Sequence, residues 1–280
     1  MLTLNLILRC AAPSKREKFI ISTNITRLCR FYKKTLLVVI RISILFTFAV
    51  LSGNLAPDTY MKHIYFDNDG TIVDSEILAV YAMLNRLKPL GFDMDAATYS
   101  MRYPGLLEKD ILKRIEMEYG IEVPDDFIEH LHRDFNEIFD IQLEVIEGMD
   151  HLFRDVKIPK SMVSNARVVH VERCMHRIGL FEGFEGKIFS AEHVARPKPN
   201  PDVYLHALAQ TGVNAHEAVA IEDSPTGVSA AKAAGIKVIG FLGAAHIADG
   251  HEVMLLENGA DYIAENASAL REILVGLNVL

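Results

Sequence analysis

Short apolar runs alternate with amphipathic stretches along residues 61–280. The apolar runs predict buried strands over residues 63–67, 161–164, 187–190, 218–221 and 237–241. The amphipathic stretches predict helices over residues 166–178, 201–210 and 225–234. The last two begin at Asn-Pro and Ser-Pro pairs and are followed by glycine, as helix ends favour. Strands that alternate with helices predict an α/β fold, a Rossmann-like parallel sheet with helices on both faces.

The residues between Ser75 and Gly148 break this alternation, because only helical patterns occur there. One apolar stripe consists of Leu107, Ile111, Leu112, Ile115 and Tyr119, and a second of Phe127, Ile128, Leu131, Phe135, Ile138 and Phe139. We therefore expect a helical cap over residues 76–147, inserted into an α/β catalytic core made of residues 61–75 and 148–280. A cap after the first strand would cover the carboxyl edge of the sheet, where open α/β sheets bind ligands.

The first sixty residues differ in charge from the rest of the chain. They hold nine basic and two acidic residues, whereas residues 61–280 hold 20 basic and 35 acidic residues. Residues 35–51 are strongly apolar, but Arg41 interrupts them and leaves a run too short to span a bilayer comfortably. Three interpretations stay open: an over-extended start upstream of Met61, a signal or anchor, and an organelle transit peptide. We expect this leader to lie outside the fold. We expect contact with a membrane only if residues 1–60 are part of the translated protein.

Charge and cysteine content narrow the class of protein. The net charge is −8, and the acidic body argues against nucleic acid as a partner, because phosphate backbones are bound by Lys and Arg. Cys174 is the only cysteine of residues 61–280, which fits a reducing compartment and a cytoplasmic location. We interpret Cys174 as a packing residue. The histidines show no spacing typical of a metal site, and we interpret most as surface or structural residues. A monomer or weak dimer is expected.

Two aspartates follow the first predicted strand directly. Asp67 and Asp69 are two residues apart, so an extended backbone would turn both carboxylates the same way. Two carboxylates that face one point repel each other unless a cation or a proton lies between them. Oxygen ligands suit Mg²⁺, so the pair indicates a magnesium site. Gly70 would allow the chain to turn away sharply.

Three further loops carry residues suited to phosphate or metal. Ser164 and Asn165 end the second strand and could hold phosphoryl oxygens. Lys198 lies between two prolines that fix where its ammonium points. Glu222 and Asp223 are adjacent acids at a strand end and are good ligands for the same cation. Each feature alone occurs in ordinary turns and helix caps, but their order and spacing together are specific.

These motifs, DxDGTxxDS, SN, KPxPD and IEDSPTGVSAAKAAG, resemble the haloacid dehalogenase superfamily. The similarity is to the subgroup with a helical cap after the first strand, which includes β-phosphoglucomutase-like phosphatases, and it runs from about Lys62 to Leu277. The resemblance implies that Asp67 is the nucleophile that forms an aspartyl-phosphate. It implies that Asp69 is the general acid and base, and that its backbone carbonyl also binds the metal.

The same resemblance assigns the other loops. Thr71 would support the Asp69 loop, Ser164 and Lys198 would neutralise the transferring phosphoryl group, and Asn165 would contact the substrate. Glu222 and Asp223 would hold Mg²⁺ together with Asp67 and Asp69. In the cap, we expect Leu107, Glu108 and Lys109 to face the substrate.

We predict a Mg²⁺-dependent phosphatase of small phosphorylated metabolites resembling sugar phosphates. An acid at Asp69 indicates phosphate chemistry, because a halide leaving group needs no proton. The main alternative is a β-phosphoglucomutase-like mutase. Mutase-like members carry a His shortly after the Asp-Ser pair and an Arg in the first cap loop, where this chain has Ala79 and Glu108. A phosphonatase and a membrane-tethered relative without catalysis are further alternatives.

Overall fold

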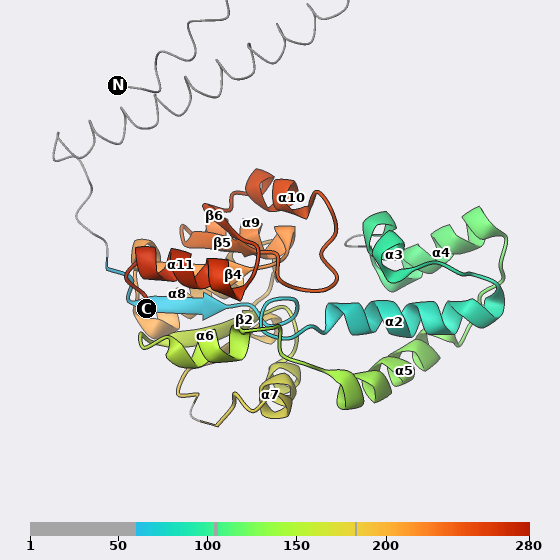
Figure 1. Ribbon diagram of the computed structural model, residues 1–280, viewed down its shortest axis with the longest axis horizontal. Helices are drawn as coiled ribbons and strands as arrows, with labels where there is room; N and C mark the ends of the chain where they lie inside the picture. The colour runs from blue at the N-terminus through green and yellow to red at the C-terminus, as the bar shows by residue number, and fades with distance from the viewer. Residues whose placement is uncertain (1–59, 104–105, 183) are drawn as a thin grey trace, which may run out of the picture. The chain divides into compact units, whose positions relative to one another are not determined.

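Six parallel strands form a sheet in the computed structural model, which describes residues 60–103, 106–182 and 184–280 (Figure 1). The strands are β1 (His63–Phe66), β2 (Lys160–Ser164), β3 (Ile188–Ser190), β4 (Ala218–Glu222), β5 (Lys237–Phe241) and β6 (Tyr262–Ala264). Their order across the sheet is β3-β2-β1-β4-β5-β6. The predicted α/β class with a parallel, Rossmann-like sheet is confirmed.

Helices cover both faces of this sheet (Figure 1). One face packs against α6 (Met149–Asp155), α7 (Val168–Arg177) and α11 (Ala267–Gly276), and the other against α8 (Asp202–Thr211), α9 (Pro225–Ala233) and α10 (His251–Glu257). In β1, Ile64 and Phe66 belong to the first apolar cluster and Tyr65 to the second, because successive side chains of a strand point to opposite faces. Because both faces of the sheet are buried, the sequences of the strands are continuous apolar runs.

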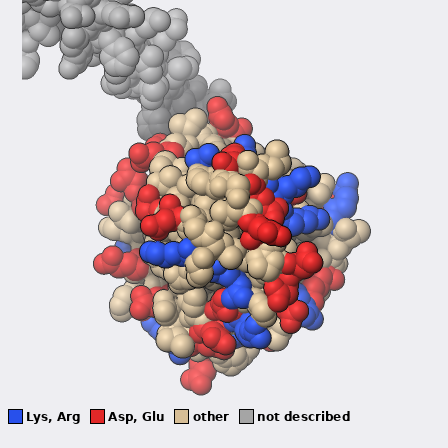
Figure 2. Space-filling view, turned by 90° about the vertical axis from the view of Figure 1, so that its right-hand side faces the viewer, with Lys and Arg blue, Asp and Glu red and all other residues tan. Residues whose placement is uncertain are grey.

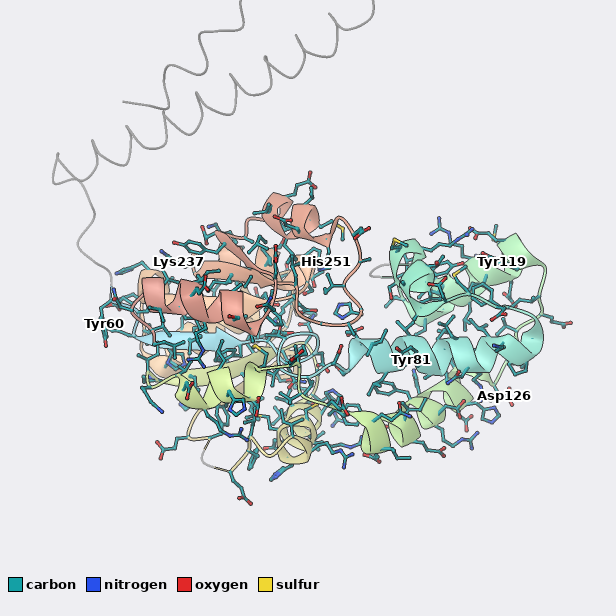
Figure 3. The ribbon with its side chains drawn as sticks, viewed as in Figure 1. Tyr60, Tyr81, Tyr119, Asp126, Lys237 and His251 are labelled. Atoms are coloured by element: carbon teal, nitrogen blue, oxygen red, sulfur yellow. The ribbon has the colours of Figure 1, made fainter. Side chains whose placement is uncertain are left out.

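Four further helices lie between β1 and α6 along the chain. They are α2 (Glu76–Leu87), α3 (Ala96–Arg102), α4 (Glu108–Tyr119) and α5 (Phe127–Gln142), and we call them the helical insertion. Their apolar side chains form a core of their own, to which Tyr99, Ile115 and Leu131 belong. Figure 3 shows Tyr81 on α2, Tyr119 at the end of α4 and Asp126 just before α5. The two predicted apolar stripes lie in α4 and α5.

Polar contacts attach the insertion to helix α7. The Arg173 guanidinium donates to Asn136 Oδ1 at 3.1 Å and to Asp140, and it lies 4.7 Å from the centre of the Phe139 ring. Arg177 donates to the backbone oxygen of Ile141 at 2.8 Å. The end of α5 is therefore held on the same helix that follows the predicted Ser164 loop.

The strand order places a switch point between β1 and β4: from β1 the chain continues to β2 on one side of the sheet, and from β4 it continues to β5 on the other side. Crevices for ligands form at the carboxyl ends of strands at such a point. Asp67 follows β1 and Asp223 follows β4, so the two predicted acidic loops meet there.

Some elements were not predicted from the pattern. Strand β6 has three residues and exposes Tyr262, and α6 and α10 have seven residues each, so their periodicity is short. Helix α11 and the three 3₁₀ helices, η1 (Lys88–Leu90), η2 (Ala191–His193) and η3 (Ala215–Glu217), were also missed. The predictions for the leader concern residues that lie, up to position 59, outside the described part. Within the described ranges, no helix is both long and apolar enough to cross a membrane.

Candidate active site

The carboxyl ends of β1, β2 and β4 bring the predicted polar residues into one buried cluster. Asp67, Lys198, Glu222 and Asp223 are 7%, 6%, 0% and 3% exposed, and Ser164 is also buried. Ionised groups are rarely buried to this degree unless they are paired or bind a metal. The sequence reasoning thus selected residues that the fold does bring together.

Lys198 is the cation at the centre of this cluster. Its Nζ donates to Asp67 Oδ1 at 2.6 Å, to Glu222 Oε1 at 2.7 Å and to the backbone oxygen of Val163 at 2.8 Å. Burial alone would lower the pKa of Lys198, but the charges of Asp67 and Glu222 outweigh it and raise the pKa. The ammonium therefore stays charged and has a fixed direction.

The donor set of this cluster fits a divalent cation. One oxygen each of Asp67, Glu222 and Asp223 lie within 4.8 Å of one another, and Lys198 is a single positive charge against three carboxylates. Without a further cation, burial raises the pKa of Asp67 to about 8 and that of Asp223 well above its ordinary value. Glu222 Oε2 is buried and has no hydrogen-bond partner among the described residues. A bound cation would resolve this excess of buried negative charge.

Two glycines let backbone approach these carboxylates. Gly70 has φ of 75°, and a Cβ there would collide with the carboxylate of Asp223 and lie 2.9 Å from the ring of His246. At Gly227, in the first turn of α9, a Cβ would overlap the carboxylate of Glu222. Any larger side chain at either position has to displace a candidate ligand.

The residues predicted to support catalysis mostly hold other site residues. Thr71 Oγ1 donates to Asp223 Oδ1 at 3.4 Å. Asn165 exchanges two hydrogen bonds with the backbone of Lys198, at 2.9 and 3.1 Å, so its amide fixes the lysine loop. Ser164 Oγ accepts from the backbone of Ala166 at 2.9 Å, which leaves its hydroxyl proton available for a ligand.

Asp69 belongs to a second group of side chains. Asp69 Oδ1 accepts from Ser75 Oγ at 2.5 Å and lies 3.2 Å from Nε2 of His170 on α7. Burial alone would raise the pKa of Asp69, but the hydrogen bonds of His170 and Ser75 outweigh it and lower the pKa. The hydrogen bond to Asp69 in turn raises the pKa of His170 to about 10. The extended backbone of β1 ends at Phe66, so the carboxylates of Asp67 and Asp69 do not share one set of partners.

Several neighbours of the site were missed by sequence reasoning. Tyr204 on α8 donates its hydroxyl to Glu222 Oε1. His246 Nε2 lies 3.4 Å from Asp223 Oδ2, and Nε2 of His251, which Figure 3 labels at the start of α10, lies 2.5 Å from the backbone oxygen of Asp223. His170 is one of the histidines of which most are expected to be surface or structural residues, and it contacts Asp69. No local pattern marks these residues, since only the packing of helices on the sheet brings them to the site.

The three predicted cap residues lie around the start of α4. Leu107 is 63% exposed, and Lys109 is also exposed. Glu108 has a partner inside the insertion, since one of its oxygens lies 2.8 Å from Nε2 of His132 on α5. Their contact with a substrate stays a prediction.

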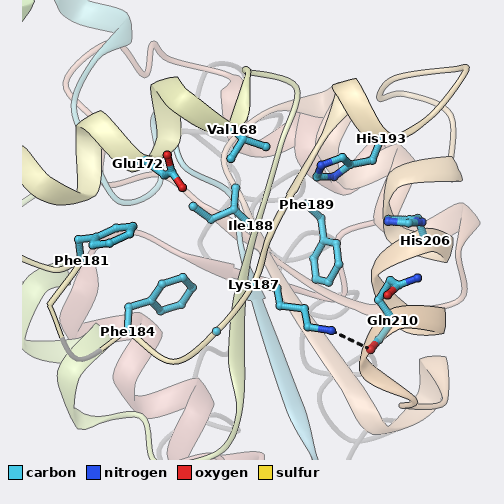
Figure 4. Close-up of a pocket in the computed structure, with 11 residues that line it drawn as sticks. Val168, Glu172, Phe181, Phe184, Lys187, Ile188, Phe189, His193, His206 and Gln210 are labelled. Carbon is cyan, nitrogen blue, oxygen red and sulfur yellow. Dashed lines mark hydrogen bonds between the residues drawn. The ribbon is translucent and has the colours of Figure 1, made fainter.

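A separate cavity of about 390 Å³ lies at the β3 edge of the sheet (Figure 4). Its lining combines Phe181, Phe184 and Phe189 with His193 and His206. No predicted site residue lines it, and the ammonium of its one lysine, Lys187, donates to the backbone oxygen of Gln210. This composition does not suit a phosphorylated ligand as well as the buried cluster does.

Figure 2 shows one face of the molecule, the right-hand side of Figure 1, where the helical insertion lies. Acidic and basic side chains are interspersed over it, without a continuous basic surface. A nucleic-acid backbone would require such a basic surface. This face therefore gives no support to a nucleic-acid partner.

Comparison with known proteins assigns the family. A family model described as haloacid dehalogenase-like hydrolase matches residues 64–241, which carry the Asp67, Ser164, Lys198 and Glu222 loops. The chain belongs to this family. The predicted superfamily is therefore confirmed, and so is the predicted enzyme class, a phosphoric monoester hydrolase.

Two relatives and one solved structure illustrate the similarity. The 6-phosphogluconate phosphatase of Escherichia coli is 29% identical over 187 residues, which cover 66% of this chain and 85% of that protein. The β-phosphoglucomutase of Bacillus subtilis is 24% identical over 221 residues, covering 75% and 92%. A conserved haloacid dehalogenase-like protein of Agrobacterium tumefaciens has the same fold, with a TM-score of 0.72, 29% identity and coverage of 78% and 99%.

Proposed function

We propose that this haloacid dehalogenase-like hydrolase is a Mg²⁺-dependent phosphatase of small phosphorylated metabolites that works through an aspartyl-phosphate. The observation that carries the proposal is the buried cluster in which Lys198 lies 2.6 Å from Asp67 and 2.7 Å from Glu222. Phosphoryl transfer requires positioning and charge neutralisation above all, and this cluster supplies both. The relatives named as phosphatases support the same class of reaction.

In the first half-reaction, a carboxylate oxygen of Asp67 attacks phosphorus, and the bond from phosphorus to the substrate oxygen breaks. Lys198 already binds Asp67 Oδ1, so Oδ2 is the oxygen we assign as nucleophile. We assign the neutralisation of the phosphoryl oxygens to Ser164 and Lys198. Asp69 gives a proton to the departing alkoxide. Ser75 and His170 both bind Oδ1 of Asp69, which leaves its Oδ2 to carry that proton, and the lowered pKa of Asp69 makes its protonated form a stronger acid toward the alkoxide.

In the second half-reaction, Asp69 takes a proton from a water molecule, and the water oxygen attacks the phosphorus of the aspartyl-phosphate. The bond to Asp67 breaks and inorganic phosphate forms. The same Asp69 side chain therefore serves as acid and then as base, and Ser75 and His170 hold it in place for both steps.

Asp67, Glu222 and Asp223 would hold Mg²⁺, together with the backbone carbonyl of Asp69. When bound, the ion supplies positive charge for the phosphoryl oxygens and relieves the repulsion between the carboxylates. Oε1 of Glu222 binds Lys198 and Tyr204, so its first contribution is to hold the lysine, while Oε2 has no partner among the described residues and is available to the ion. The two partners of the Asp223 carboxylate, Thr71 and His246, lie at 3.4 Å.

The substrate class rests on relatives and on the helical insertion, which we propose to be the cap (residues 76–147). The matched relatives act on phosphorylated small molecules, one of them 6-phosphogluconate, and a sugar-phosphate-like metabolite fits this pattern. A phosphomutase is the second candidate because a β-phosphoglucomutase is among the relatives. Mutase-like members carry a His where this chain has Ala79 and an Arg where it has Glu108, and Glu108 is bound to His132. A cytoplasmic location also stays a prediction.

A panel of phosphorylated metabolites tests the proposal with the full-length protein. Release of inorganic phosphate should require added Mg²⁺, stop with EDTA, and fall to background in Asp67→Asn, which keeps the size of the side chain. An isomerised sugar phosphate that forms faster than inorganic phosphate would decide for a mutase. Hydrolysis that survives EDTA or Asp67→Asn would refute the proposed mechanism.

A further inference from the structure

His170 brings one imidazole nitrogen within reach of both an acid and a thiol. Its Nε2 lies 3.2 Å from Asp69 Oδ1 and 3.5 Å from Cys174 Sγ, one helical turn further along α7. These three ligand atoms all lie within 4.8 Å of one another. The cluster is distinct from the all-oxygen group of Asp67, Glu222 and Asp223.

Two of the spacings match edges of a zinc coordination tetrahedron. Bonds of about 2.0 Å from Zn²⁺ to nitrogen and oxygen, and about 2.3 Å to sulfur, place nitrogen about 3.3 Å from oxygen and about 3.5 Å from sulfur at a tetrahedral angle. The structure has 3.2 and 3.5 Å for these two pairs. Thiolate and imidazole are borderline and soft donors, which select Zn²⁺ over Mg²⁺.

Asn68 provides a second observation that points to a ligand. This side chain is fully buried, and its amide nitrogen donates to Cys174 Sγ at 3.3 Å. Its carbonyl oxygen Oδ1 is buried without a hydrogen-bond partner in the described part of the chain. A half-turn of the amide as an ion binds would place that oxygen beside the sulfur as a fourth donor.

The cluster is reachable and stable in position. Cys174 is buried, but the side chains of Asp69 and His170 are 21% and 26% exposed, so an ion enters past them. The ring centre of His170 lies 5.2 Å from that of Phe139 on α5. Ser75, directly before α2, donates a hydrogen bond to Asp69. The donors are therefore arranged before any ion binds.

We propose that Asp69, His170 and Cys174 form a binding site for Zn²⁺ or a similar thiophilic ion, and that its occupation inhibits the enzyme. Binding replaces the hydrogen bond between His170 and Asp69 with two metal bonds and releases the thiol proton of Cys174 and the proton of the imidazolium. The bound ion on Oδ1 of Asp69 lowers the basicity of the whole carboxylate, so Oδ2 no longer takes up the proton that the reaction requires. This inhibitory effect rests on the proposed function of Asp69, whereas the binding itself does not.

Cobalt spectroscopy of the full-length chain tests the site alone. In a Cys10→Ser, Cys29→Ser background, Cys174 is the only thiol, so a sulfur-to-cobalt charge-transfer band on addition of Co²⁺ with excess Mg²⁺ reports that ligand. We expect one equivalent of Co²⁺ to bind and Zn²⁺ to displace it. Cys174→Ser should abolish the band, and His170→Gln should weaken binding at least about tenfold. The matched control is His176→Gln, an exposed position on the same helix, which should leave binding unchanged.

Thermal unfolding of each variant identifies any that fail to fold. If Cys174→Ser does not fold, His170→Gln decides, because the side chain of His170 is partly exposed and its replacement disturbs the core less. No charge-transfer band in the parent, or a band that survives Cys174→Ser, would overturn the site. Phosphatase activity tests the consequence: Zn²⁺ at excess Mg²⁺ should inhibit the parent at least about tenfold more strongly than Cys174→Ser. A cobalt band without inhibition by Zn²⁺ would confirm the binding site, but it would overturn the proposed inhibition and the role of Asp69 on which that inhibition rests.

Discussion

The Lys198 ammonium lies 2.6 Å from Oδ1 of Asp67, with both side chains buried at the point where β1 and β4 meet. The two residues are 131 positions apart in the chain, and the sheet order brings them together. The ion pair fixes which oxygen of Asp67 is engaged and which is free. It also places the positive charge where a phosphoryl group would arrive.

Replacement of Lys198 by methionine should therefore abolish activity and lower stability. The change leaves buried carboxylates without their cation, and removing one partner of a buried pair costs about 3–5 kcal/mol. The double variant Lys198→Met, Glu222→Gln should recover part of this loss but no activity. Urea denaturation and phosphate release measure the two effects.

Lys232→Met is the matched control, because Lys232 pairs with Asp261 at the surface. Its free energy of unfolding should change by less than about 1 kcal/mol. Equal destabilisation by the two lysine substitutions would show that the buried pair does not contribute as described.

Alanine at Gly227 should damage the site without removing any functional group. Its Cβ would overlap the buried carboxylate of Glu222, so either Glu222 or the start of α9 has to move. We expect about 1–3 kcal/mol of destabilisation and a loss of activity, since Glu222 holds Lys198. Gly276→Ala is the control: no atom lies within 4 Å of a Cβ there, so stability should stay constant or rise by up to about 1 kcal/mol. If both variants keep full activity, the close packing at Gly227 is unimportant.

His63 should contribute less to stability as the pH drops below neutrality. This residue is buried in β1, bonded to Ser161 and packed against the ring of Tyr65, and burial lowers the pKa of His63 from 6.5 to about 4. Below pH 6.5 the unfolded chain binds a proton that the folded protein resists down to about pH 4. The contribution of His63 to the free energy of unfolding should therefore fall with pH in that window, by up to about 2 kcal/mol between pH 7 and 5.

The variant His63→Gln isolates this contribution, because glutamine can keep the hydrogen bond to Ser161 and does not titrate. Between pH 7 and 5, the free energy of unfolding of the parent should decrease relative to that of the variant, while at pH 8 the two differ only by the cost of the substitution. Parallel pH dependences of the two proteins would exclude His63 as a source.

The loops of the candidate site could be predicted because each follows an apolar run. Asp67, Ser164 and Glu222 are placed at strand ends by local pattern alone, and parallel strands bring their carboxyl ends to one edge. The contacts of His170, Cys174 and Tyr204 could not be predicted, since these residues belong to helices whose rotation on the sheet depends on the whole core. The partners of Asp69, which are Ser75 and His170, could not be predicted from its two-residue spacing from Asp67, since the extended backbone of β1 ends at Phe66.

Direct detection of phosphate on Asp67 tests the proposed mechanism most directly. In Asp69→Asn, attack on p-nitrophenyl phosphate remains feasible because its leaving group needs little protonation, whereas hydrolysis of the aspartyl-phosphate loses its base. Rapid acid quench and peptide mass spectrometry should show one added phosphoryl group on the peptide that contains Asp67, and none in Asp67→Asn, Asp69→Asn. The account would be contradicted if the parent releases phosphate while Asp69→Asn shows no phosphoryl group on Asp67, or if the phosphoryl group lies on another residue.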